Sequence, residues 1–294
     1  MPQPRYYATA AAFRHALEER LKATAKRDLT DLNRLRRKVA FDRLLARLFQ
    51  AETPPWALKG GYALELRFKS ARSTVDIDLT LQSFVAPTAS TGDINRDVRE
   101  LLQNAATVSL SDWFEFNVGL PIMDLTAAPY GGARYPIEAR MDGRIFARFH
   151  LDIGLGDVII NPLEVIECQD WLEFAAIKPA QVRMISCEQQ FVEKIHAYTL
   201  PRNHANSRVK DLADLALLIG LRDLDRASIY QALHLTFERR ATHTLPDNLP
   251  APPPSWQAPF RQLAQECGLP TNLESVFNHV QEYFHNLLNH AAGR

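Results

Sequence analysis

The pattern of apolar and polar positions divides the chain into a helical start, a β-rich middle and a helical second half. Apolar side chains recur every three or four positions over residues 9–50, which predicts helices there. Pro54 and Pro55 interrupt this pattern. After a polar loop over residues 82–91, apolar positions at helical spacing predict a further helix that begins near Asp93.

The middle of the chain is rich in alternating apolar and polar residues, as expected for strands with one buried face. Four such segments are predicted: residues 113–118, 122–125, 134–141 and 144–153. Asp142 and Gly143 separate the last two segments, and this dipeptide is typical of a two-residue hairpin turn. We therefore expect a mostly antiparallel sheet that carries a helix or two.

The second half of the chain is largely helical. Ser186 with Gln189 forms a capping-box pattern, which predicts a helix that ends near Tyr198. Further helices are expected over residues 209–219, 225–236, 258–267 and 273–291, with a polar loop over 201–207 and a proline-rich connector over 244–255. The fold class is therefore α+β, with a sheet domain over residues 1–180 and a helical domain over residues 181–294.

Composition limits the class of protein. The 294 residues are 46% hydrophobic and 23% charged, which is ordinary for a globular protein. There is no run of 18 or more apolar residues, so no membrane span is expected. The N-terminus lacks the apolar core of a signal peptide, and three widely spaced cysteines suit a reducing compartment. We therefore expect a cytoplasmic protein.

Charge is unevenly distributed, although the whole chain sums to zero. Residues 1–50 contain 12 Lys and Arg against 5 Asp and Glu, a net charge of 12 − 5 = +7, so the remaining residues sum to −7. A basic segment of this kind can contact nucleic acid, and it can equally be a pair of solvated helix faces. The sequence leaves both readings open.

Candidate chemistry concentrates between Leu58 and Leu81. Gly60 and Gly61 come first, and glycines allow the backbone to approach a phosphate closely. Asp76 and Asp78 follow on a predicted strand, where positions two apart share a face. Two neighbouring carboxylates repel each other unless a cation lies between them, and Mg²⁺ prefers such oxygen ligands.

A third carboxylate is expected from the predicted hairpin. Asp152 lies among apolar residues near the end of the second hairpin strand, where sheet pairing could bring it beside Asp76 and Asp78. It could instead be a residue of the turn, and Glu138 on the same hairpin is a rival. Glycines followed by three carboxylates suit nucleotidyl transfer, in which two metal ions hold a nucleoside triphosphate and activate an acceptor hydroxyl.

The same residues carry a family resemblance. The segment LKGGYALELRFKSARSTVDIDL is similar to the first motif of the AbiEii/AbiGii-type nucleotidyltransferase toxins, within the DNA polymerase β-like superfamily. The segments Glu193–Ala197 and Arg208–Leu215 resemble later motifs of that family. The chain resembles in particular the mycobacterial MenT toxins, which transfer nucleotides to the 3′ end of tRNA. The superfamily often has Gly-Ser at this motif, whereas this chain has Gly60 and Gly61, followed by Tyr62.

The resemblance implies a polymerase β-like core and a set of roles. Asp76, Asp78 and Asp152 would bind the metal, with Asp152 also acting as the base. Gly60 and Gly61 would line the triphosphate. Lys194 and Asp211 match family positions important for activity. Thr74 falls where MenT toxins have a Ser or Thr that an antitoxin can phosphorylate.

Three neighbouring residues have open or ordinary interpretations. Arg72 could bind a phosphate or pair with a local carboxylate, and we favour the phosphate. Asp214 is interpreted as a charge near a helix N-terminus, where the helix dipole favours it. His196 is interpreted as a packing residue.

The sequence thus predicts a toxin of a toxin–antitoxin pair that transfers a nucleotide from an NTP to tRNA with Mg²⁺ or Mn²⁺. Its expected partners are tRNA and a cognate antitoxin, which could be a kinase. One alternative is transfer to a protein or small-molecule hydroxyl. The other is a nucleotide-binding regulatory module without turnover.

Overall fold

A computed structural model describes residues 6–292, except residues 69, 83–90, 203–207 and 222; the side chains of residues 91–93, 221 and 290–292 are also not described. Most of the two loops predicted over residues 82–91 and 201–207 therefore lies outside the described residues.

The described strands form one mixed sheet in the order β3-β5-β6-β2-β1-β8-β7, with β4 paired to β5. Their bounds are β1 (Trp56–Lys59), β2 (Asp76–Leu81), β3 (Glu115–Val118), β4 (Met123–Asp124), β5 (Gly132–Met141), β6 (Arg144–Leu155), β7 (Glu164–Glu167) and β8 (Gln181–Met184). Antiparallel pairs join β1 to β2 and join β5 to β3, β4 and β6, whereas β2–β6 and β1–β8 are parallel. The prediction of a mostly antiparallel sheet is confirmed.

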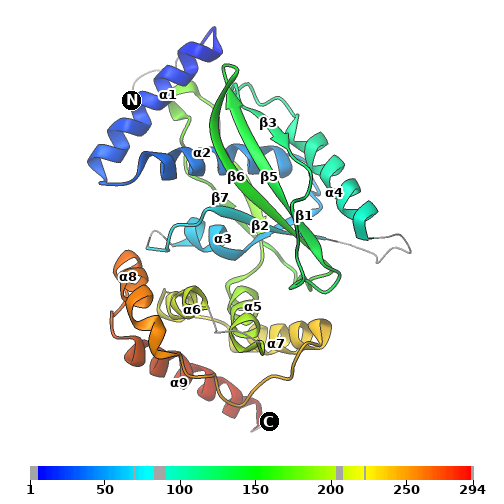
Figure 1. Ribbon diagram of the computed structural model, residues 1–294, viewed down its shortest axis with the longest axis vertical. Helices are drawn as coiled ribbons and strands as arrows, with labels where there is room; N and C mark the ends of the chain where they lie inside the picture. Colours follow the sequence, from blue (N-terminus) through cyan, green and yellow to red (C-terminus); the bar gives the residue numbers. More distant parts are fainter. Residues whose placement is uncertain (1–5, 69, 83–90, 203–207, 222, 293–294) are drawn as a thin grey trace. The chain divides into compact units, whose positions relative to one another are not determined.

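The hairpin of β5 and β6 is the longest feature of the sheet (Figure 1, green). Asp142 and Gly143 form its turn, both with positive φ, at 55° and 65°. Positive φ at both central residues matches the twist of the flanking strands, which is why this dipeptide favours a hairpin. The strands β1, β7 and β8 were not predicted, because each has only four residues and too little alternation to be recognised.

All helices predicted from the sequence form. Their bounds are α1 (Ala10–Arg27), α2 (Leu32–Leu48), α3 (Gly60–Arg67), α4 (Thr91–Ala106), α5 (Cys187–Thr199), α6 (Val209–Leu221), α7 (Arg226–Arg240), α8 (Gln257–Cys267) and α9 (Leu273–Ala292), with short 3₁₀ turns η1 (Glu173–Ala175) and η2 (Pro254–Trp256).

The predicted cap of α5 forms only in part. Ser186 accepts a hydrogen bond from the backbone N–H of Gln189 at 3.1 Å. The Gln189 side chain does not return to Ser186; it donates to the carbonyl oxygen of Val158 and accepts from the N–H of Ile160. One half of the capping box is thus used to tie the preceding loop to α5.

The described chain divides into two compact units. Unit 1 comprises Met1–Tyr62, Ser73–Gly156 and Val165–Met184, and it contains nearly all of the sheet. Unit 2 comprises Ala63–Arg72, Asp157–Glu164 and Ile185–Arg294. The boundary passes through α3, so the two ends of this short helix belong to different units.

Unit 2 is built around α6, which contacts α5, α8 and α9 (Figure 1). Leu212, Leu215 and Leu218 of α6 are fully buried. Leu64 and Phe68, which follow the glycine pair in the sequence, join the same core. A helix that is apolar on nearly all sides is expected at the centre of a helical cluster.

In unit 1, α2 holds the start of α3 in place. Tyr62 packs edge-on against Phe41 of α2, with ring centroids 4.9 Å apart. The Tyr62 hydroxyl donates to Asp42 Oδ1 at 2.5 Å, and Trp171 Nε1 donates to Asp42 Oδ2 at 2.8 Å. Since Tyr62 follows Gly60 and Gly61 directly, this buried anchor fixes the backbone of the glycine pair.

Burial raises the pKa of the Asp42 carboxyl from 3.8 to about 6, although the hydrogen bonds from Tyr62 and Trp171 act in the opposite direction. A carboxyl whose pKa rises on folding stabilises the folded state below its unfolded value. That stabilisation is lost as pH rises towards the folded value, here between 3.8 and about 6. The ionised form of Asp42 therefore depends on its two donors.

We predict that Tyr62→Phe lowers the free energy of unfolding by about 1–3 kcal/mol near neutral pH, because ionised Asp42 loses a donor. The loss should be smaller below the unfolded pKa of Asp42, where the carboxyl is protonated in both states. Urea unfolding at the two pH values measures this difference. Tyr6→Phe, at an exposed tyrosine, is the control and should leave both midpoints unchanged. An equal loss at both pH values contradicts the prediction.

Candidate active site

The three predicted carboxylates lie on one face of the sheet in unit 1. The parallel register of β2 and β6 places Asp78 opposite Asp152 and Asp76 opposite His150. Ile77 between the two β2 carboxylates is fully buried on the other face. Asp152 is therefore beside the pair, as the hairpin pattern predicted.

The rival residue Glu138 lies elsewhere on the hairpin. It is opposite Arg148 in the β5–β6 register, and Arg148 donates to it through Nε and Nη2 at 2.9 and 2.8 Å. Arg140 is its second cationic partner. Glu138 is thus held in an arginine pair, and it is not opposite either β2 carboxylate.

Arg134 of β5 is a member of this face that the sequence did not single out. Its Nε and Nη2 donate to the two carboxylate oxygens of Asp152, each at 2.8 Å, and Nη2 also donates to Asp76 Oδ2 at 3.2 Å. Asp152 raises the pKa of Arg134, with smaller contributions from Asp76 and Asp78. Alternation along β5 could have put Arg134 on this face, but its pairing required the register with β6.

Gly60 lies against one of these carboxylates. Its φ is +69°, in the left-handed region that side chains disfavour, and a Cβ at this position would lie 2.0 Å from Asp78 Oδ2. In the β1–β2 register the preceding residue, Lys59, is opposite Asp78. Gly61 is buried within α3. A glycine is needed at position 60 both for the backbone conformation and for the approach of Asp78.

The donor set fits a divalent cation, but its present arrangement does not form a metal site. Three carboxylates on one face supply the hard oxygen ligands that Mg²⁺ and Mn²⁺ prefer. Among the described residues, however, no three metal-ligating side chains converge on a common point. The oxygens of Asp152 and Asp76 are directed to Arg134 and, for Asp76 Oδ1, to His150 Nδ1 at 3.2 Å.

Thr74 lies just before β2 and is partly buried. Its Oγ1 donates to the backbone carbonyl oxygen of Asp76 at 3.3 Å. The hydroxyl is thus two residues from the first carboxylate of the candidate site.

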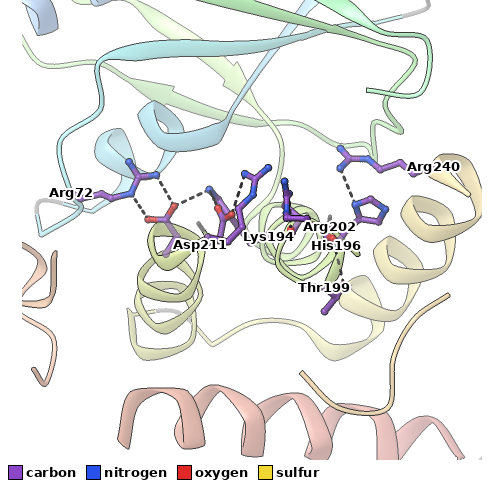
Figure 2. A network of polar contacts seen from close by, with 10 residues as sticks. Arg72, Lys194, His196, Thr199, Arg202, Asp211 and Arg240 are labelled. Carbon is purple, nitrogen blue, oxygen red and sulfur yellow. Dashed lines mark hydrogen bonds and ion pairs between the residues drawn. The ribbon is translucent and has the colours of Figure 1, made fainter. Parts of the chain in front are cut away.

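A second polar network lies within unit 2, on α5 and α6 (Figure 2). The ammonium group of Lys194 lies 2.8 Å from Asp211 Oδ1 and 2.8 Å from Asp214 Oδ2. Arg72 donates to both oxygens of Asp214, from Nε to Oδ1 at 3.0 Å and from Nη2 to Oδ2 at 2.9 Å. The positions of the two aspartates, three apart on a helix, let both face Lys194.

Charge pairing dominates the titration of this network. Burial lowers the pKa of Lys194, but Asp211 and Asp214 outweigh it, and the pKa is raised overall. Burial likewise raises the pKa of Asp214, but Lys194 and Arg72 outweigh it, and that pKa is lowered. Lys194 and Asp214 are therefore both ionised near neutral pH.

The interpretation of Asp214 as a dipole charge near a helix N-terminus is wrong. Asp214 is fully buried and bridges Lys194 and Arg72. For Arg72, the observed contact is with this carboxylate.

His196, on the same helix as Lys194, is buried as expected for a packing residue (Figure 2). Its Nδ1 faces Arg240 Nη1 at 3.3 Å, and its Nε2 lies 2.9 Å from Thr242 Oγ1. Burial, followed by the charge of Arg240, lowers the pKa of His196 to about 3. Since a guanidinium only donates, Nδ1 is the acceptor and the proton of the neutral ring is on Nε2.

We predict that Asp214→Asn lowers the free energy of unfolding by about 3–5 kcal/mol at neutral pH, because it leaves two buried cations short of a partner. A carboxyl whose pKa is lowered on folding stabilises the protein above its unfolded value of 3.8, and loses this effect as pH falls through the folded value. The difference between wild type and variant should therefore shrink below pH 3.8.

Urea unfolding across this range is the measurement. The exposed Asp247→Asn is the control and should leave the midpoint unchanged. A difference that does not depend on pH contradicts the assignment of Asp214 as an ionised, buried partner.

Solved structures give matches of low sequence identity. One is MenT4, a nucleotidyltransferase toxin from Mycobacterium tuberculosis H37Rv, with 17% identity, a TM-score of 0.49, and coverage of 96% of this chain and 99% of that chain. Another is JHP933 from Helicobacter pylori, with 13% identity, a TM-score of 0.47, and coverage of 88% and 95%. No curated protein sequence gives a significant match.

Two further findings concern membrane association and family membership. In the part of the chain that the structure describes, no helix combines the length and the apolar character that crossing a membrane requires. The sequence matches a family model, described as the nucleotidyl transferase AbiEii toxin of type IV toxin–antitoxin systems, over residues 43–286. Because this match covers well over half of the chain, the protein belongs to the AbiEii family of nucleotidyl transferase toxins.

Proposed function

We propose that this toxin transfers a nucleotide from an NTP to the 3′ end of tRNA in a reaction that depends on Mg²⁺ or Mn²⁺, and so blocks translation in the cytoplasm. The observation that supports this most directly is the register of β1, β2 and β6. It puts Asp78 opposite Asp152 on one side, and opposite the residue before Gly60 on the other. Carboxylates for a cation and a glycine backbone for phosphate are thereby adjacent.

The proposed roles follow from this arrangement. Asp76, Asp78 and Asp152 would hold the divalent cation, which would lower the pKa of the acceptor hydroxyl and stabilise the pyrophosphate leaving group. The 3′ oxygen would form a bond to the α-phosphorus while the bond to pyrophosphate breaks, and Asp152 would take the hydroxyl proton. Gly60 and Gly61 would line the triphosphate.

The helical part is proposed to contribute Lys194 and Asp211. Asp211 and Asp214 keep Lys194 charged, and a lysine held in this way can act as a point cation towards phosphate. A phosphate contact for Arg72 would require it to share its guanidinium with Asp214. The proposal retains the division into a sheet domain over residues 1–180 and a helical domain over residues 181–294.

The partners are proposed from charge and from the family. The net +7 of residues 1–50 suits tRNA, and the affinity should then fall steeply with salt. Membership of a type IV toxin–antitoxin family implies a cognate antitoxin. If that antitoxin is a kinase, a phosphate on Thr74, whose hydroxyl contacts the backbone of Asp76, would add negative charge near the carboxylate pair and oppose metal and triphosphate binding.

The function is tested by incubating the protein with Mg²⁺, each labelled NTP and total tRNA. We expect label on tRNA, and a loss of more than about 100-fold for Asp78→Asn, since even the outer partners of metal ligands cost 10–100-fold. Label on a protein band instead of on tRNA would indicate that the nucleotide is transferred to a protein. NTP binding with no pyrophosphate release would indicate a regulatory module.

The role of Gly60 is tested with a matched pair of glycines. Gly60→Ala and Gly143→Ala both put a side chain at a φ near +65°, a strain of about 1–2 kcal/mol, but only the first also displaces Asp78. We predict that Gly60→Ala loses transfer activity by about 100-fold or more. Gly143→Ala should keep it, because nothing lies within 4 Å of its added Cβ. Equal activities of the two variants contradict the proposed role.

A further inference from the structure

We call the sheet face that carries Asp76, Asp78 and Asp152 the carboxylate face. This face already contains a cation, the guanidinium of Arg134. It donates two hydrogen bonds to Asp152 and one to Asp76. Nδ1 of His150 contacts the remaining oxygen of Asp76, Oδ1, at 3.2 Å. All four oxygens of Asp76 and Asp152 are therefore engaged by groups of the protein itself.

These contacts engage the same carboxylate oxygens that a metal ion would need. A forked guanidinium–carboxylate pair contacts both oxygens of Asp152 in the plane in which ligands approach. A divalent cation bound by Asp152 and Asp76 would also lie close to the positive charge of Arg134 and repel it. The guanidinium and the cation therefore compete for these oxygens.

We propose that Arg134 is the resident counter-ion of the carboxylate face, and that a divalent cation binds there by displacing this guanidinium from Asp76 and Asp152. This inference rests on the proposed metal-dependent function and adds a residue that sets the metal affinity. Without the metal, Arg134 offsets the repulsion among the carboxylates. With the metal, the pair is broken, and the cost of breaking it lowers the affinity.

The surroundings of Arg134 allow this exchange. Its side chain is 26% exposed, so the guanidinium can move into solvent without being left buried and unpaired. The buried pairs of the protein differ in this respect, since Asp214 and its partner Arg72 are 0% and 10% exposed. Arg134 is therefore a releasable cation, whereas Arg72 is a structural one.

The experiment measures Mn²⁺ binding to the full chain by calorimetry and by the loss of the free-ion EPR signal. We expect Arg134→Gln to bind Mn²⁺ about 10- to 100-fold more tightly than wild type, the factor that corresponds to the charge-assisted hydrogen bonds no longer broken. Arg134→Lys, which keeps the charge but not the fork, should lie in between.

The chain offers a matched control. Arg148 also donates two hydrogen bonds, through Nε and Nη2, to a carboxylate on the same hairpin, both to Oε2 of Glu138. Arg148→Gln also removes an arginine from a carboxylate pair, but not from the carboxylate face, so it should leave the Mn²⁺ affinity unchanged. Asp76→Asn should weaken binding in both the wild-type and the Arg134→Gln backgrounds.

Thermal unfolding gives a second readout that does not depend on activity. Arg134→Gln should melt at a lower temperature than wild type without metal, and should gain more from the same excess of Mn²⁺, because stabilisation by a ligand grows with the logarithm of its affinity. Equal or weaker Mn²⁺ binding by Arg134→Gln overturns the inference and leaves the proposed function standing. No Mn²⁺ binding by wild type or any variant overturns both.

Discussion

Repulsion among carboxylates on one face of a sheet is the constraint on which the candidate site of unit 1 depends. The parallel pairing of β2 with β6 forces Asp78 and Asp152 into adjacent positions, and Asp76 extends the same face. Ionised carboxylates at adjacent positions repel each other, and a nearby cation offsets that repulsion. Arg134 supplies that charge from the neighbouring strand. Gly60 supplies the space, since no larger residue could lie so close to Asp78.

In unit 2, neighbouring carboxylates are likewise offset by cations, but there the paired groups are largely buried. Lys194 and Arg72 share Asp214, and Asp211 pairs with Lys194 and, at 3.4 Å, with Arg208. Charge pairing lets Lys194 and Asp214 be buried, and these contacts hold α5, α6 and the segment after α3 in one arrangement. Arg134 is more exposed than Lys194 and Arg72. We therefore propose that Arg134 can be exchanged for a metal ion, whereas Lys194 and Arg72 stabilise the fold.

Those parts of the fold and of the candidate site that depend on a local sequence signal could be predicted. The period of two along β2 put Asp76 and Asp78 together, and the Asp142–Gly143 turn fixed the hairpin that carries Asp152. The partners could not be predicted, because strand register brings Arg134 to Asp152, and helix packing brings Asp214 to Lys194; both are tertiary. Asp42 was missed for the same reason: a single carboxylate on an amphipathic helix shows no sign of the tyrosine and tryptophan that surround it.

The most direct test of the central claim is anomalous diffraction from crystals of the protein grown with Mn²⁺ and a non-hydrolysable NTP analogue. The account predicts a manganese peak bound by oxygens of Asp76, Asp78 and Asp152, with the guanidinium of Arg134 withdrawn from Asp152. A manganese ion bound elsewhere, or an Arg134–Asp152 pair that stays intact beside a bound ion, would contradict it.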